Sequence, residues 1–149
     1  MQYFTGSSPI RVWAERVNAN NRTTLNNDNV VITLKFGEGS IGSIVYAASG
    51  DRSLGREQIE IFCEGGSVVM QDFKQTFFHR HGRRTAYRTF NQEMGYLQEL
   101  RNFAGAIRGT DQPGLTPDEI FISTRTVFCI KRALEGDMPI PVEPIAGSL

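Results

Sequence analysis

Hydrophobic and polar residues alternate with a period of two through much of the chain as far as Phe90. This pattern is typical of strands whose two sides meet different surroundings. It predicts strands at residues 10–17, 30–36, 41–48, 58–63 and 68–73, then a hairpin over 74–90 that turns at residues 81–83. Short glycine-containing segments predict tight turns between strands. The asparagine-rich segment 18–29 predicts a loop.

The period then changes to that of a helix. A helix is predicted from about Gln92 to Arg108, with Gly109 ending it and with an apolar stripe of Leu97, Leu100, Phe103, Ala104 and Ile107. A second helix is predicted to begin with Thr116 as N-cap and to end at Gly136, because Pro117 and Glu119 complete a capping box. Its expected packing face is Ile120, Ser123, Val127, Ile130 and Leu134, and Phe121 and Phe128 are expected in the core. Prolines make residues 138–142 an extended tail, with an edge strand as the alternative.

Strands in an unbroken run followed by two helices predict an α+β fold, a mostly antiparallel open sheet of about six strands with two main helices on one face. The 149 residues fit one domain. Met1–Gly6 has the pattern of a helix's last turn, which Gly6 ends. We therefore expect residues 1–6 to be the remnant of a helix cut from a longer protein.

The predicted strands are apolar on both faces, and two helices can cover only one of them. The other face is expected to meet a further domain or a second copy of the chain, and a homodimer or higher oligomer is the prediction. The candidate interface residues are Trp13, Val31, Thr33, Ile44 and Tyr46. A period of two does not decide which side the helices take.

The composition of the chain excludes several classes of protein but does not by itself indicate a function. The formal net charge is zero, with 40% hydrophobic and 21% charged residues, so a global footprint for nucleic acid is absent. We expect no membrane contact and a cytoplasmic protein, because the chain shows neither a spanning apolar run nor a signal-peptide pattern. Cys63 and Cys129 are expected to be reduced and buried, with one disulfide as the alternative.

Residues 37–42, Gly-Glu-Gly-Ser-Ile-Gly, match the G-x-G-x-x-G dinucleotide fingerprint. That site requires a helix after the glycines, whereas strand sequence follows here, so a hairpin turn and no cofactor site are predicted. No nucleophile elbow occurs, and the acidic pair Asp118–Glu119 is explained by the capping box. We therefore predict no catalytic residue and no metal site.

Two groups of arginines are candidate contacts for an anionic substrate. The segment 77–88 is basic, contains both histidines and includes Arg83 and Arg84. A solvated hairpin tip, an anionic ligand, nucleic acid and a metal pair at His79 and His81 are the alternatives there. Arg52 and Arg56 lie in a polar loop between two strands, where fork-shaped guanidinium groups suit carboxylate or phosphate, or simply water.

Several segments, in order, are similar to the C-terminal domain of the glucose-fructose oxidoreductase / inositol dehydrogenase / MocA family. Residues 28–44 resemble its hairpin D-N-x-x-x-x-L-x-F-x-x-G-x-x-G-x-I, and residues 60–66 resemble E-x-x-G-x-x-G, with Cys63 where glycine is frequent. Residues 96–109 resemble its helix E-L-x-x-F-x-x-A-I-R-x-G, and residues 133–136 its closing helix. Residues 1–6 resemble the segment that follows the family's catalytic helix. The sequence from this hairpin to residue 84 is similar to that of a subgroup in which this domain follows a zinc-type alcohol dehydrogenase-like part.

The resemblance implies a role and a deficit. In the family the nucleotide-binding Rossmann-type domain, with its catalytic lysine, histidine and aspartate, lies upstream of the segments matched here. The chain is then expected to be a domain for substrate binding and oligomerisation, inactive alone, in a protein that uses NAD or NADP on a sugar or polyol derivative. The alternative is a stand-alone binding module that uses residues 77–88 for an acidic ligand or partner.

Overall fold

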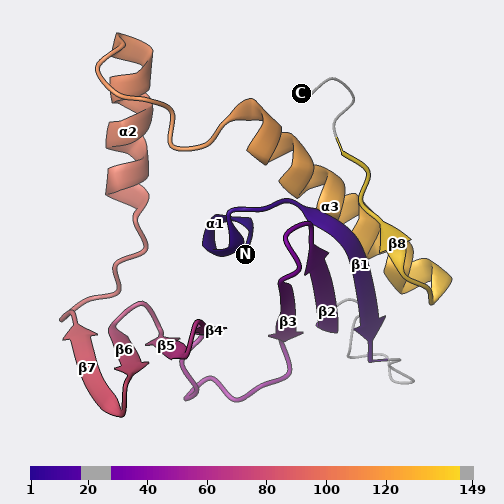
Figure 1. Cartoon of the computed structure of the whole chain (residues 1–149), viewed down its shortest axis with the longest axis horizontal. Coiled ribbons are helices and arrows are strands. Elements are labelled where there is room, and N and C mark those ends of the chain that lie inside the picture. Colours follow the sequence, from indigo (N-terminus) through magenta and orange to yellow (C-terminus); the bar gives the residue numbers. More distant parts are fainter. Residues whose placement is uncertain (18–27, 145–149) are drawn as a thin grey trace. The chain divides into compact units, whose positions relative to one another are not determined.

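The computed structural model of the chain describes residues 1–17 and 28–144 (Figure 1). Most of the predicted asparagine-rich loop at 18–29 lies outside the described residues. The chain divides into two compact units, whereas its size alone predicts one domain. Unit 1 is Met1–Ser49 with Leu115–Leu149, and unit 2 is Gly50–Gly114.

Unit 1 contains a four-stranded antiparallel sheet, sheet A, in the order β3-β2-β1-β8. Its strands are β1 Pro9–Arg16, β2 Asn29–Phe36, β3 Ile41–Ala47 and the short β8 Ile140–Pro141. All of its neighbouring strands run antiparallel. The short helix α1, Gln2–Thr5, precedes β1 and ends at Gly6, whose φ of 63° is left-handed as predicted.

Helix α3, Pro117–Gly136, covers one face of sheet A along β1 and β8 (Figure 1). Alternate residues of β1 and β2 point at it, since successive side chains of a strand face opposite sides. The buried hydrophobic core consists of Val12, Ala14, Val30, Ile32, Leu34, Phe36, Ile122, Cys129, Ala133, Ile140 and Val142. Phe36 and Val12 are the largest fully buried side chains.

The predicted packing face of α3 is mostly wrong. Ile120 and Val127 are exposed, and the helix buries Ile122, Thr126, Cys129 and Ala133 instead, with Ile130 and Leu134 partly buried. The expected core residues Phe121 and Phe128 are also exposed. Because α3 is apolar on two opposite sides, helical spacing alone cannot choose the side that meets the sheet.

The predicted start of α3 is confirmed in detail. The Thr116 hydroxyl accepts the Glu119 backbone N–H at 3.2 Å, and the Glu119 carboxylate accepts the Thr116 backbone N–H at 2.7 Å. Pro117 occupies the first turn, where its missing N–H costs nothing. The helix includes Gly136, and Asp137, at φ 52°, is the left-handed C-cap, one residue later than predicted.

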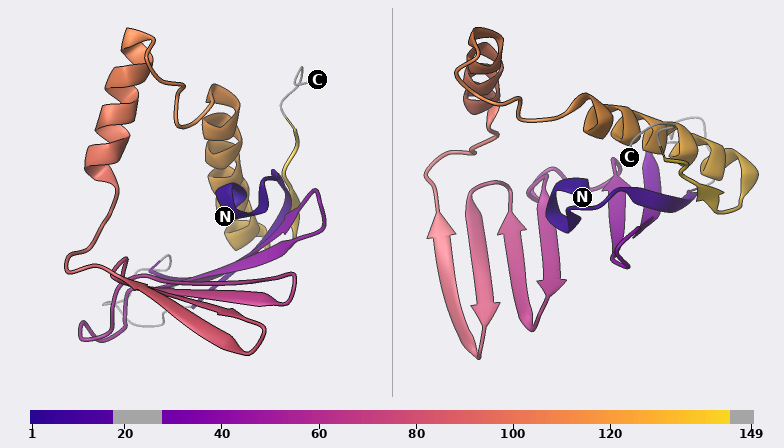
Figure 2. Two further views of the ribbon diagram at one scale, coloured as in Figure 1. Left: turned by 60° about the vertical axis from the view of Figure 1, so that its left-hand side comes forward. Right: turned by 45° about the horizontal axis from the view of Figure 1, so that its top comes forward.

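Unit 2 contains a second four-stranded antiparallel sheet, sheet B, in the sequential order β4-β5-β6-β7 (Figure 2). The strands are β4 Gln58–Cys63, β5 Gly66–Gln71, β6 Gln75–Arg80 and β7 Arg83–Arg88. Glycine-containing turns at residues 64–65 and 81–82 connect β4 to β5 and β6 to β7 as predicted. Residues 72–74 join β5 to β6 without a glycine, so the prediction of 72 and 73 as strand is wrong. One face of the sheet is mainly apolar by register, with Ile59, Ile61, Val68, Met70, Phe78 and Tyr87.

Helix α2, Tyr96–Arg108, completes unit 2 and ends at Gly109 as predicted, with a φ of 73°. Its N-cap is Gly95, so the helix begins four residues later than Gln92. The predicted apolar stripe does not pack: Leu97, Leu100, Phe103 and Ile107 are all more than half exposed. Within unit 2, α2 therefore leaves both faces of sheet B uncovered.

The predicted fold class is confirmed, since the chain combines antiparallel sheets with helices. Two details differ. The described residues form eight strands in two hydrogen-bonded sheets rather than about six in one, and α3 alone covers a face of sheet A within unit 1. Alternation of polar and apolar residues identifies strands but does not show which strands pair. Because β3 and β4 are not paired, the strands form two sheets instead of one.

Candidate functional site

The glycine fingerprint at residues 37–42 forms the turn of the β2–β3 hairpin, as predicted. The Phe36 N–H donates to the Ser40 carbonyl at 2.9 Å, and β3 begins at Ile41. Gly39 needs its glycine, because its φ is 108°. Hydrogen bonds from the Ser40 and Ser7 side chains lower the pKa of Glu38 in this turn. The segment is a strand connection, without the helix N-terminus that holds a pyrophosphate.

The basic segment forms the hairpin of β6 and β7, whose two-residue turn is His81-Gly82. Both turn residues have positive φ, 51° and 70°, which is the geometry of a type I′ turn. The sequence predicts a turn of three residues, 81–83. The shorter turn places Arg83 in β7, directly opposite Arg80.

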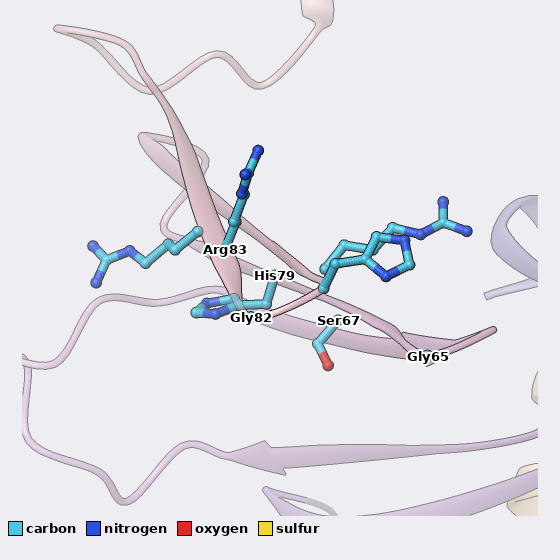
Figure 3. A pocket seen from close by; sticks show the side chains of 8 residues that line it. Gly65, Ser67, His79, Gly82 and Arg83 are labelled. Atoms are coloured by element: carbon cyan, nitrogen blue, oxygen red, sulfur yellow. The ribbon is translucent and has the colours of Figure 1, made fainter.

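The register distributes the charges of this hairpin tip over both faces of sheet B. His79 pairs with Arg84 on one side, in a row with Ser67, and Arg80 pairs with Arg83 on the other. Figure 3 shows Arg83 and Ser67 projecting from opposite sides of the sheet. The Arg84 guanidinium lies over the Phe77 ring, 4.2 Å from its centroid, and this contact fixes its orientation.

A shallow hollow of about 280 Å³ lies at this end of sheet B (Figure 3). The turn Glu64-Gly65 between β4 and β5 reaches the same end, because Gly66 pairs with Arg80. The lining residues are Gly65, Ser67, His79, Arg80, His81, Gly82, Arg83 and Arg84. All of their side-chain polar groups can donate hydrogen bonds, and none is a carboxylate or an amide.

The other arginine candidates, Arg52 and Arg56, lie in the exposed loop before β4. The Asp51 carboxylate accepts the Ser53 backbone N–H at 2.8 Å, and hydrogen bonds from Ser53, chiefly its side chain, lower the pKa of Asp51. The Arg56 backbone N–H donates to Asp72 at 3.3 Å. The loop is thus structured by carboxylates, while both guanidinium groups remain exposed.

Asp72 is an organising residue that sequence reasoning missed. Besides the Arg56 N–H, its carboxylate accepts the Gln92 side-chain amide at 2.7 Å and pairs with Lys74 at 3.4 Å. Its own φ is 52°. Lys74 is two residues away, but Arg56 precedes β4 and Gln92 follows β7, so no local signal marks these two as partners of Asp72.

The four candidate arginines do not form one site. The loop of Arg52 and Arg56 leads into Gln58, which belongs to the same end of sheet B as Gln71, Gln75 and Arg88. Arg83 and Arg84 lie at the opposite end, and six-residue strands separate the two ends by about 20 Å. A single compact ligand therefore reaches one pair only.

The five interface candidates are divided between the two faces of sheet A. Trp13, Val31 and Thr33 lie on the face away from α3, since Trp13 pairs with Thr33 and Glu15 with Val31. Ile44 and Tyr46 pair with the core residues Ile32 and Val30, so they lie on the α3 side, and their assignment to the open face is wrong. The length of the β2–β3 turn sets this register, which alternation alone does not reveal. Val45, opposite Val31, takes their place on the open face.

Other candidate chemistry is limited in the described ranges. No group of three or more His, Cys, Asp or Glu residues is arranged there to hold a metal. Cys129 is buried and Cys63 exposed, both as free thiols, so the prediction that both are buried is wrong for Cys63. Among the described helices, none has the length and hydropathy to cross a bilayer.

Comparisons with known proteins identify the fold. No family model and no curated protein matches the chain. Solved structures do match. An oxidoreductase from Agrobacterium radiobacter in complex with NAD+, L-tartaric acid and magnesium gives a TM-score of 0.76 at 10% identity, covering 95% of this chain and 45% of its own. An aldose-aldose oxidoreductase from Caulobacter crescentus gives 0.75 at 18%, covering 94% and 43%.

A UDP-N-acetylglucosamine 3-dehydrogenase from Acidithiobacillus ferrooxidans gives a TM-score of 0.74 at 16% identity, covering 90% of this chain and 43% of its own. The chain thus spans less than half the length of the solved proteins that it matches. These neighbours are oxidoreductases of the type predicted from the sequence motifs. The chain therefore has the fold of a domain of glucose-fructose oxidoreductase / inositol dehydrogenase / MocA-type enzymes, and the predicted resemblance is confirmed.

Proposed function

We propose that the chain is the substrate-binding and assembly domain of an NAD(P)-dependent oxidoreductase that acts on a sugar or polyol derivative, and that it is inactive alone. The observation that carries this proposal is the asymmetry of the structural matches. They cover 90–95% of this chain and only 43–45% of each neighbour. The remainder of such an enzyme would supply the functions that the residues described here do not.

The cofactor is proposed to bind outside this chain, in a Rossmann-type domain that precedes it in the longer protein. One neighbour was solved with NAD+ bound. Here the glycine sequence most similar to a dinucleotide motif is occupied by a hairpin turn, in which Gly39 and Ser40 bond back to Phe36. A pyrophosphate would find no helix N-terminus at that turn.

A sugar derivative is the proposed substrate class. Two of the neighbours are named for aldoses and for a UDP-linked amino sugar. The proposed contacts from this chain are Arg52 and Arg56 at one end of sheet B, or Arg83 and Arg84 at the other. Each pair offers planar donors that suit carboxylate or phosphate groups on a sugar.

The test uses the longer polypeptide that carries this chain, compared with the same polypeptide cut before Met1. Removal of residues 1–149 is expected to abolish turnover of a sugar substrate while nicotinamide-nucleotide affinity stays within about threefold. The matched control is the 149-residue chain alone, titrated calorimetrically with NAD+ and NADP+. Micromolar affinity in that control, or turnover without residues 1–149, would contradict the proposal.

We also propose that two copies of the chain associate through the open face of sheet A. Trp13, Val31 and Val45 are 40%, 46% and 69% exposed on that face. Burial of apolar surface contributes about 25 cal/mol per Å², and a two-fold dimer is the simplest closed assembly. Covering this face in a pair of chains would remove the patch from water.

Neighbouring residues on opposite faces provide a matched test of this interface. Val45→Glu places a charge on the open face, whereas Tyr46→Glu places it on the α3 side, at a similar exposure of 57% against 69%. Sedimentation should show at least tenfold weaker association for Val45→Glu and little change for Tyr46→Glu. A wild-type monomer at tens of micromolar, or equal effects of the two substitutions, would refute the dimer.

A further inference from the structure

The charge distribution at the tip of the β6–β7 hairpin is unbalanced. No Asp or Glu occurs between Asp72 and Glu93, while β6, β7 and their turn contain four arginines and both histidines of the chain. The ion pair found in the described residues joins Lys74 to Asp72, so Arg80, Arg83 and Arg84 have no carboxylate partner there. Glu64, in the adjacent turn, pairs with none of them. The tip is therefore a local concentration of unneutralised positive charge in a chain whose net charge is zero.

The strand register makes this concentration unfavourable for the hairpin itself. Arg80 lies directly opposite Arg83. Like charges in directly opposed positions destabilise a strand pair. The type I′ turn at His81-Gly82 admits no slip that would separate them, because the register is fixed by the turn length. An anion in the hollow that Arg80, Arg83 and Arg84 line would relieve the repulsion between Arg80 and Arg83, and no carboxylate described here does so.

The donors are also held in place before any ligand arrives. The Phe77 ring supports the Arg84 guanidinium at 4.2 Å, which leaves the N–H edge of the fork free for a bidentate contact. Arg84 shares its face of the sheet with His79 and Ser67, both of which can donate hydrogen bonds. The hollow that these residues line with Arg80 and Arg83 measures about 280 Å³.

From these observations we infer that the hairpin tip is a binding site for a phosphate or diphosphate group. The hollow lies below the roughly 300–1,000 Å³ of sites that enclose a whole small molecule, so it suits one charged group of a ligand. The hydroxyls of a neutral sugar need acceptors as well as donors, and the side chains that line the hollow offer no carboxylate or amide acceptor. A phosphate needs donors only. A phosphate site would specify one part of the substrate in the proposed function. Only the identity of the remainder of the ligand, a sugar derivative, rests on that proposed function.

A single-stranded nucleic acid is a less suitable occupant. Such sites present aromatic faces on which successive bases stack. At this tip the Phe77 ring is covered by Arg84, and Phe78 projects from the opposite face of the sheet, among apolar neighbours such as Val68. Nucleic acid therefore enters only as an outcome of the test.

The test is calorimetric titration of the 149-residue chain with sodium pyrophosphate, UDP and uridine at constant ionic strength. Pyrophosphate and UDP are expected to bind saturably and uridine not at all. Arg83→Gln/Arg84→Gln should weaken both anions at least tenfold. The matched control is Arg101→Gln/Arg108→Gln on exposed positions of α2 in the same unit, which removes the same charge and should change affinity less than twofold.

Further variants separate the possible outcomes. Arg84→Lys keeps the charge and loses the planar fork, so an intermediate affinity is expected if the stacked guanidinium makes the contact. Binding of UDP but not pyrophosphate would locate the recognition elsewhere and overturn the inference. So would equal losses in the control variant, absence of saturable binding, or a single-stranded RNA that displaces pyrophosphate at equimolar phosphate. Turnover by the longer polypeptide, which tests the proposed function, is independent of each of these results. NAD+ and NADP+ also carry phosphate groups, so their binding to the isolated chain counts against the proposed function only where Arg83→Gln/Arg84→Gln leaves that binding unchanged.

Discussion

Both units contain a four-stranded antiparallel sheet, but they differ in the interactions that stabilise it. Sheet A lies under α3, and the core between them excludes water from Val12 and Phe36, which are 0% and 1% exposed. In residues 50–114, all of which are described, Gly105 is the single buried residue. Sheet B is held by its hydrogen-bonded ladders and by Asp72, while its apolar face stays only partly buried.

The difference shows that amphipathic pattern and burial are separate properties. Leu97, Leu100 and Phe103 form as regular a stripe on α2 as the buried residues do on α3, yet they remain exposed. An apolar stripe indicates that a helix surface packs against another apolar surface, but it does not identify the element or partner that supplies that surface. Unit 1 contains its cover within the chain, and unit 2 does not contain one within itself. The stability of unit 2 should therefore depend on partners far more than that of unit 1.

The largest difference between the two units is expected for a matched pair of phenylalanine substitutions. Phe36→Ala removes a fully buried ring from unit 1 and should destabilise the chain by about 3–5 kcal/mol. Phe78→Ala removes a ring that is 46% exposed in unit 2 and should cost about 1 kcal/mol or less. Urea unfolding followed by the fluorescence of Trp13, the single tryptophan, reports on unit 1, and unfolding followed by far-UV circular dichroism reports on both units. Similar losses in the two variants would mean that sheet B has a core of its own in solution.

Amide hydrogen exchange measures the opening of the two units without mutation. Backbone N–H groups in β1 and β2 belong to the strands that supply most of the buried core of unit 1 and should open only with unit 1 as a whole. Those in β5 and β6 are also central in their sheet, but no core covers them. We expect protection factors about 10–100-fold lower in β5 and β6, measured residue by residue by NMR. Equal protection would show that the two units open together.

Local chemistry explains what the sequence predicts well. The capping box of Thr116 and Glu119, the left-handed Gly6 and Gly109, and the hairpin turn at Gly39 all depend on neighbours within a few residues. Such signals act before distant parts of the chain meet. The basic hairpin tip could likewise be identified from sequence, because its charges are contiguous.

What the sequence does not predict is non-local. Ile44 and Tyr46 alternate correctly, but their face depends on pairing with Ile32 and Val30. The exposed residues Phe121 and Phe128 of α3 are as apolar as the buried residues of that helix. The side of α3 that packs is therefore decided by its contact with sheet A, which helical spacing does not reveal. At the site, the stacking of Arg84 on Phe77 and the gathering of partners by Asp72 depend on contacts across strands.

The helix starts give a smaller difference between the units. Thr116 caps α3 through its hydroxyl, whereas Gly95 begins α2 without any side-chain hydrogen bond. Thr116→Ala should cost about 1 kcal/mol of stability, seen in the urea midpoint. Gly95→Asn is the counterpart: asparagine tolerates the φ of 78° and adds a capping oxygen, so α2 should gain amide protection or stay unchanged. A loss for Gly95→Asn that equals the loss for Thr116→Ala would remove this distinction.

The smallest effect expected is a pH dependence in the same capping box. Hydrogen bonds from the Thr116 backbone, and then from its side chain, lower the pKa of Glu119 below its ordinary value of 4.5. A carboxyl whose pKa is lower in the folded state binds fewer protons there, so its contribution is present above about pH 4.5 and is lost as the pH falls through the folded pKa. The substitution Glu119→Gln keeps an acceptor for the Thr116 N–H but does not titrate.

The thermal midpoint of this variant should match that of the wild type within a few degrees at pH 7 and should fall less steeply between about pH 5 and 3. Asp118→Asn, at the neighbouring position of the first turn, is the control for loss of a charge near the helix N-terminus. If Asp118→Asn flattened the acid limb as much as Glu119→Gln, the effect would come from the helix dipole and not from the capping hydrogen bonds.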